Sequence, residues 1–337
     1  MMKKWLFRGL IALASVVVSV TAIGSVYEAM GRREAAIDFP PPGKMVDIGG
    51  RSIQLDCRGT GSPTVVFESG LDMHGSLSWA AVQDAVAETT RACTYSRAGI
   101  MWSDPGPVPR NGKSIAEDLH AALERGGEQG PFVLVGHSLG GPYAMTFTKY
   151  FGNDVAGLVL VDPSHPEQTS RFKAVRETEP SAMKIISKLG TALAWSGVVR
   201  ALQPLFPGVP NQLPETARAV TAYASTSLKA AVHEIDAMEQ TLAEAGTFRR
   251  LGNRPLVVLT SMAPLPAGAL AAMKMTPEQG RQFKEIWKGM HDEEASWSSS
   301  SQHMLIPDAG HYIQFDRPAM VTAAVSSVVA RVRGKLK

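Results

Sequence analysis

A serine between glycines follows an apolar run near the middle of this 337-residue chain. The run PFVLV, residues 131–135, predicts a buried strand, and GPYAMTFTKYF, residues 141–151, predicts a helix with proline in its first turn. Between them lies Gly136-His137-Ser138-Leu139-Gly140. A serine on a sharp strand-to-helix turn exposes its hydroxyl, and the helix N-terminus favours negative charge that develops beside it. Ser138 is therefore the candidate nucleophile.

A histidine near the C-terminus is the candidate base. His311 lies in DAGHYIQFDRP, between an expected strand at 302–307 and an expected closing helix at 318–333. Imidazole titrates near neutral pH, so it can take the serine proton and return it to a leaving group. The other histidines lack this position: His137 belongs to the serine turn, and helix surfaces are expected for His120, His233 and His291.

The elements around these residues alternate between strands and helices. Strands are expected at 45–48, 52–57, 64–69, 91–96, 131–135, 155–161, 255–260 and 302–307, and helices at 114–127, 141–151 and 318–333. This order predicts an α/β fold with a mostly parallel sheet covered by helices on both sides. Between Asp162 and Arg254 the pattern is helical with proline-containing breaks. Such an insert is typical of a lid over the carboxyl edge of the sheet, where these folds bind ligands, and a purely structural excursion is the alternative.

Five stretches together resemble the serine-hydrolase branch of the α/β-hydrolase fold family: SPTVVFESG, YSRAGIMWSD, VGHSLGG, LVLVDPSHPEQ and GHYIQFDRP. The resemblance covers roughly residues 45 to 335. It implies a core formed by residues 38–164 and 253–337, with a helical cap, residues 165–252, inserted after the sixth strand. It also implies that the backbone N–H groups of Leu71 and Leu139 form the oxyanion hole. The turn at Ser96 departs from the family pattern, which has an aspartate there, so Arg97 lacks the usual local partner.

The acid that would orient His311 is missing from its usual place. Most of the family carries it after the strand that PLVVLT matches, and here TSMAPLPAG contains no carboxylate. Part of the family carries it after the preceding strand, where Asp162 follows the run VAGLVLV. Asp162 is therefore the candidate acid, although an Asp-Pro pair also favours a plain turn. The rivals are Asp292, Glu293 and Glu294 in HDEEASW, and Asp308 near the base.

The chain has two cysteines, Cys57 and Cys93. In an exported protein such a pair suggests a disulfide, and two inert buried thiols are the alternative. The family resemblance places their two strands side by side, which favours the disulfide.

Residues 1–33 differ from the rest of the chain. Lys3, Lys4 and Arg8 precede an apolar segment that has no charge until Glu28, and two arginines follow it. Its length suits a membrane-spanning helix, and the basic residues before it predict a cytoplasmic N-terminus. We therefore expect an uncleaved anchor with the catalytic domain outside the cytoplasm, in the periplasm or at the cell surface. Secretion after cleavage near Gly24 is the alternative.

The sequence thus predicts a membrane-anchored serine hydrolase that acts on a small, largely apolar ester or acyl compound through an acyl-enzyme. The net charge of +3 gives no basis for binding nucleic acid, and no metal or organic cofactor is implied. An amidase, a cofactor-free perhydrolase or a carbon–carbon bond hydrolase on the same triad would be an alternative, as would a binding protein that keeps the fold without catalysis. The oligomeric state stays open.

Overall fold

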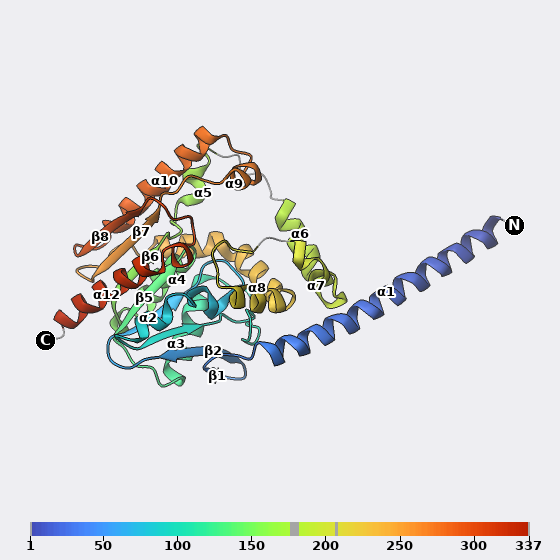
Figure 1. The fold of residues 1–337 in the computed structure, drawn as a ribbon, viewed down its shortest axis with the longest axis horizontal. Coiled ribbons are helices and arrows are strands. Elements are labelled where there is room, and N and C mark those ends of the chain that lie inside the picture. Colours follow the sequence, from blue (N-terminus) through green and yellow to red (C-terminus); the bar gives the residue numbers. More distant parts are fainter. Residues whose placement is uncertain (1, 176–181, 206–207, 336–337) are drawn as a thin grey trace.

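A single twisted sheet forms the centre of the computed structural model, which describes residues 2–175, 182–205 and 208–335 (Figure 1). The sheet has eight strands in the order β1-β2-β4-β3-β5-β6-β7-β8. The strands are β1 Lys44–Asp47, β2 Ser52–Arg58, β3 Thr64–Glu68, β4 Ala92–Tyr95, β5 Phe132–His137, β6 Val155–Val161, β7 Leu256–Ser261 and β8 Ser301–Ile306. β1 and β2 are antiparallel to their neighbours, and all other pairs are parallel. The predicted α/β fold class is confirmed.

Helices cover both faces of the sheet. The helices of the described residues are α1 Met2–Asp38, α2 Gln83–Ala87, α3 Gly112–Arg125, α4 Gly140–Tyr150, α5 Gln168–Phe172, α6 Ala182–Leu193, α7 Val198–Leu202, α8 Pro214–Gly246, α9 Ala267–Ala272, α10 Pro277–Ala295, α11 Ile313–Asp316 and α12 Pro318–Lys335. Short 3₁₀ turns are η1 Gly75–Trp79, η2 Gly152–Asp154, η3 Ala194–Ser196 and η4 Gln203–Leu205. We call residues 165–252, which hold α5 to α8, the insert.

The central strands are apolar on both faces because two separate cores pack on them. In β5, Phe132 and Leu134 face the core shared with α3 and α4, whereas Val133 and Val135 face the core shared with α2 and α12. This alternation explains why the run PFVLV has no polar residue. It also holds the carboxyl end of β5, where Ser138 follows, rigidly between two packed layers.

The two cysteines form a disulfide between β2 and β4. Cys57 and Cys93 are directly opposed in the antiparallel register of these strands. The bond therefore joins the antiparallel edge of the sheet to its parallel centre.

The N-terminal helix α1 extends away from the body of the molecule (Figure 1). Its apolar side chains from Phe7 to Ile23 are largely exposed, and the helix is long and apolar enough to cross a membrane. Its C-terminal part packs on η3, α7 and α8 of the insert.

Candidate active site

Ser138 lies at the tip of a tight turn between β5 and α4. Its backbone has φ 52°, in the left-handed region that non-glycine residues rarely adopt. Glycine is needed at Gly136 because a side chain there would overlap the carbonyl oxygen of Gly140. Strained backbone of this kind is concentrated at functional sites. The turn directs Ser138 into a cavity at the carboxyl edge of the sheet.

Asp162 and His311 form a hydrogen-bonded pair beside this serine. The Nδ1 of His311 lies 2.7 Å from Oδ2 of Asp162, and both residues line the same cavity as Ser138. Asp162 directly follows β6 and has φ 44°, so it shares the unusual backbone of Ser138. A carboxylate only accepts hydrogen bonds, so the Nδ1–H of His311 donates and its Nε2 is left to accept a proton. The structure therefore brings together the three residues that the sequence singles out.

Three groups that the sequence did not indicate hold the Asp162 carboxylate. It accepts hydrogen bonds from the backbone N–H of Ser261 at 2.8 Å, from the Ser261 hydroxyl at 2.8 Å and from the Trp287 indole at 3.0 Å. Lys284 donates to the same hydroxyl at 2.8 Å. Because lysine has only donors, Ser261 Oγ accepts from Lys284 and its single proton points at Asp162. Ser261 ends β7, the strand after which an acid is missing.

His311 and nearby cationic groups keep Asp162 ionised. Its side chain is buried, and burial alone would raise the pKa of the carboxyl. The hydrogen bond from His311, together with the charges of His311, His291 and Lys284, outweighs burial and holds the pKa of Asp162 well below its usual range. Asp162 is therefore negatively charged at neutral pH.

Three of the four rival acids are paired with other residues. Asp292 pairs with Lys288 at 2.7 Å and with His303 at 2.8 Å. Glu293 pairs with Arg249 at 2.9 Å, and the remaining two rivals are a buried Glu294 and an Asp308 paired with Arg317. Among the described residues, the carboxylate that pairs with His311 is that of Asp162.

Two further histidines surround the pair in structural roles. The Nε2 of His137 donates to the backbone carbonyl of His311 at 2.9 Å, which anchors the loop that carries the base. His291 is buried, so its expected place on a helix surface is wrong. Its Nε2 donates to the Pro163 carbonyl at 2.8 Å, and its Nδ1 lies 2.6 Å from the Thr260 hydroxyl. His291 therefore joins α10 to the segment that follows Asp162.

Replacing His291 with asparagine is expected to reduce the acid sensitivity of the fold. Burial lowers the pKa of His291 to about 4, whereas the unfolded chain takes up this proton near pH 6.5. The free energy of unfolding therefore falls as the pH drops below 6.5, since protons favour the unfolded state. From pH 7 to pH 5 the wild type should lose about 2 kcal/mol more than the variant. Denaturant unfolding of both chains at both pH values measures the difference, and equal losses would contradict it.

The predicted oxyanion residues both line the cavity that contains Ser138. Leu71 follows β3 and Leu139 follows the serine. The loop before Leu71 is fixed because Arg97 donates to the carbonyl oxygens of Ser69 at 2.8 Å and Gly70 at 2.6 Å. Backbone amides held in this way suit a charge that develops on a substrate oxygen.

Arg97 finds its counter-charges far away in the sequence. In place of an aspartate at Ser96, Glu68 of β3 and Glu234 of α8 each pair with the guanidinium at 2.8 Å. All three charged side chains are buried. The ion pairs therefore couple the oxyanion loop to the insert.

The cavity at this edge has a volume of about 590 Å³ and a largely apolar wall. The segment after β7 contributes Ala263, Pro264, Leu265 and Pro266. Much of the rest of the wall is formed by Phe283 and Trp287 of α10 and Met238 of α8. The sequence segment that lacks an acid thus forms one wall of the cavity. A carbonyl compound with an apolar acyl or alkyl group fits such a lining.

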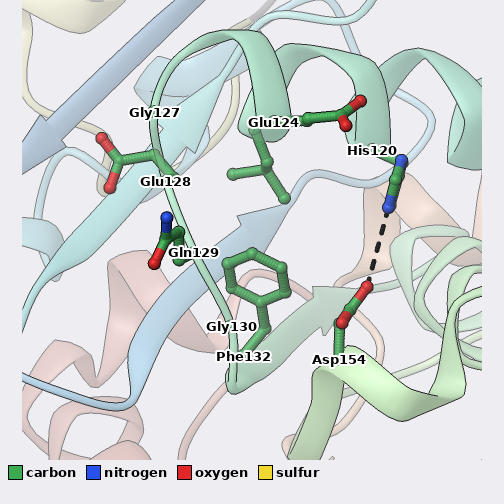
Figure 2. A pocket seen from close by; sticks show the side chains of 9 residues that line it. His120, Glu124, Gly127, Glu128, Gln129, Gly130, Phe132 and Asp154 are labelled. Carbon is green, nitrogen blue, oxygen red and sulfur yellow. Dashed lines mark ion pairs between the residues drawn. The ribbon is translucent and has the colours of Figure 1, made fainter.

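A second pocket of about 310 Å³ lies at the opposite end of β5 (Figure 2). It contains Glu124 and Glu128, and the Nε2 of His120 lies 3.6 Å from Asp154, an ion pair that Figure 2 draws. No serine, threonine or cysteine lines it. The lining of this pocket offers no hydroxyl or thiol nucleophile, so we take the cavity at Ser138 as the candidate active site.

Among the described residues, one group has the spacing of metal ligands: Cys57, Cys93 and Glu128. Both of its sulfur atoms are already used in the disulfide, which removes the thiolates that a metal would need.

The comparisons with known proteins agree on the fold. Residues 55–325 match the profile of the Alpha/beta hydrolase family. An esterase from Thermogutta terrifontis superposes with a TM-score of 0.57 at 21% identity, over 86% of this chain and 98% of the esterase. A meta-cleavage product hydrolase from Pseudomonas fluorescens superposes with a TM-score of 0.57 at 12% identity, over 86% of this chain and 98% of that enzyme.

The first curated relatives are matched over half or less of their own length. A protein described as probable transporter efuK from Hormonema carpetanum is 24% identical over 328 residues, which cover 86% of this chain and 43% of that protein.

Proposed function

Because the chain belongs to the alpha/beta hydrolase family, we propose that it is a serine hydrolase of small, largely apolar esters or related acyl compounds. The observation that carries the proposal is the His311–Asp162 pair, which lines an apolar cavity together with Ser138 on its strained turn. The insert is proposed to act as the cap of this cavity, since Met238 and Pro210 contribute to the wall.

The reaction proceeds in two halves. His311 Nε2 takes the Ser138 proton as the hydroxyl oxygen attacks the carbonyl carbon, and Asp162 stabilises the imidazolium that forms. The backbone N–H groups of Leu71 and Leu139 bind the oxyanion. His311 then protonates the leaving alcohol, which leaves an acyl group on Ser138. Water, activated by the same imidazole, hydrolyses this ester and restores the enzyme.

The same geometry supports related reactions at an acyl carbon. An amidase, a cofactor-free perhydrolase and a carbon–carbon bond hydrolase would use the same triad, because the fold does not specify the substrate. We favour the ester because the wall of the cavity is largely apolar.

We place the catalytic domain outside the cytoplasm, with α1 as the anchor. The basic residues Lys3, Lys4 and Arg8 precede the apolar part of α1 and favour a cytoplasmic N-terminus. The disulfide supports this placement, since such bonds persist in oxidising compartments.

Labelling with a fluorophosphonate probe tests the proposal. We expect the full-length chain in detergent to label, and mass spectrometry of its peptides to find the adduct on Ser138. Prior unfolding should abolish labelling, because the reaction depends on the assembled triad. A folded chain that stays unlabelled would refute the enzyme and favour a binding protein that keeps the fold.

A further inference from the structure

The insert carries a row of exposed apolar side chains beside α1. We call it the insert ridge: Ile186, Leu189 and Leu193 of α6, Trp195 of η3 and Leu202 of α7, which are 45–58% exposed. The first three share one face of α6, since they are spaced by three and four residues. Large apolar groups gathered on the surface of a soluble body usually mark a contact.

The turn that carries Trp195 is in direct contact with α1. A side chain at Gly24 of α1 would overlap the carbonyl oxygen of Ser196, and one at Gly197 would lie 2.5 Å from the carbonyl oxygen of Gly24. Trp195 is thus part of the turn on which α1 packs backbone to backbone. Figure 1 shows α1 passing the tip of the α6–α7 hairpin, where η3 and α7 contact it, before it leaves the body.

Buried polar contacts fix α1 to the insert. Glu28 of α1 is buried, pairs with Arg200 of α7 at 2.9 Å and accepts from the Ser225 hydroxyl of α8 at 2.7 Å. Tyr223 of α8 donates to the Phe39 carbonyl oxygen at 3.1 Å, just beyond the helix. The orientation of α1 therefore determines the orientation of the ridge.

The charge pattern of α1 locates the edge of a bilayer along it. Residues 9–27 carry no charged side chain, and as a helix they span roughly 28 Å, close to the ~30 Å of a hydrocarbon core. The first charge after them is Glu28, one turn beyond the contact at Gly24. If α1 crosses the membrane, η3 and the ridge lie at the level where hydrocarbon meets head groups.

We propose that the insert ridge rests in the surface of the lipid bilayer that α1 crosses, an inference that depends on α1 acting as the proposed anchor. The ridge continues the apolar surface of α1 at the depth of the interface. Tyr27 of α1, which lies beside Gly197, and Trp195 of η3 are each about half exposed. Both residue types concentrate at membrane interfaces. An amphipathic α6 lying in the membrane plane completes the arrangement.

Site-directed spin labelling in nanodiscs of phosphatidylcholine and phosphatidylglycerol tests this placement. Both native cysteines are in the disulfide, so Leu193→Cys or Leu189→Cys provides a single thiol in the full-length chain. Val16→Cys in α1 is the reference for lipid. Val108→Cys, at a position outside both α1 and the insert where the side chain is 62% exposed, is the reference for water. The readout is the accessibility of the label to oxygen and to a polar nickel chelate.

We expect the ratio of oxygen to nickel accessibility at both ridge positions to exceed that at Val108→Cys several-fold and to approach that at Val16→Cys. If the labels at the ridge were accessible to the nickel chelate while the label at Val16→Cys was accessible mainly to oxygen, the ridge proposal would be overturned and the anchor would stand. Low access to both reagents would mean that protein, such as a second copy, covers the ridge, which also overturns it. If the label at Val16→Cys were as accessible to the nickel chelate as the label at Val108→Cys, both the anchor and the ridge proposal would be refuted. None of these results depends on catalysis.

Discussion

Replacing Ser138 with alanine is expected to lower kcat for a chromogenic short-chain ester by ~10⁵-fold or more. The hydroxyl oxygen is the only proposed nucleophile, so its loss leaves His311 with no proton to take. The oxyanion amides at Leu71 and Leu139 belong to the backbone and stay in place, which preserves a small residual rate. Steady-state hydrolysis by the purified full-length chain measures the change, and a matching thermal unfolding temperature shows that the variant is folded.

Ser164→Ala is the matched control. Ser164 lines the same cavity and donates its backbone N–H to the Ser138 carbonyl at 2.8 Å, but this contact does not involve its hydroxyl. Its loss should therefore reduce kcat far less. If both variants lost activity to the same extent, or if Ser138→Ala kept more than a few per cent of the wild-type rate, the nucleophile would have to be another group.

The centre of the sheet could be predicted closely because its strands are buried on both faces. PFVLV, VAGLVLV and PLVVLT each show as unbroken apolar runs, and the structure places β5, β6 and β7 within two residues of them. The pairing of Cys57 with Cys93 came from the resemblance to the family and is confirmed. Local pattern and motif context are sufficient wherever the controlling contacts lie within one element or one turn.

The support of Asp162 could not be predicted, since its partners are distant in the sequence. Ser261 and Trp287 lie on β7 and α10, and Lys284 acts through Ser261. A signal existed, however. Ser261 ends the strand after which the acid was sought, so the position that lacks a carboxylate supplies the hydrogen bonds to one on the neighbouring strand.

The buried face of α10 was misjudged for a related reason. Lys284, Trp287, His291 and Glu294 repeat at helical spacing and are all buried, yet three of the four are polar. A search for apolar periodicity therefore misses this face. Apolar periodicity also fails to indicate that Arg97 and Glu234 are buried, because their burial depends on the ion pair that they form across the boundary of the insert.

Replacing Asp162 with asparagine is expected to lower kcat by ~10⁴-fold at neutral pH, because Asp162 orients the base His311. The carboxylate accepts the Nδ1–H of His311 at 2.7 Å and so leaves Nε2 free to accept a proton. An amide at this position can donate to Nδ1 instead, which favours the tautomer with its proton on Nε2. That tautomer cannot take the proton of Ser138, and the imidazolium also loses its counter-charge.

Asp292→Asn is a matched control for this change, because Asp292 belongs to the rival motif and also contacts a histidine, His303, at 2.8 Å. This pair lies outside the lining of the cavity, so the variant should hydrolyse the ester within a fewfold of wild type. Raising the pH should not restore Asp162→Asn, since the tautomer rather than the ionisation of His311 limits it. If instead Asp292→Asn were the inactive variant, the acid would lie on α10 and Asp162 would be a structural turn residue.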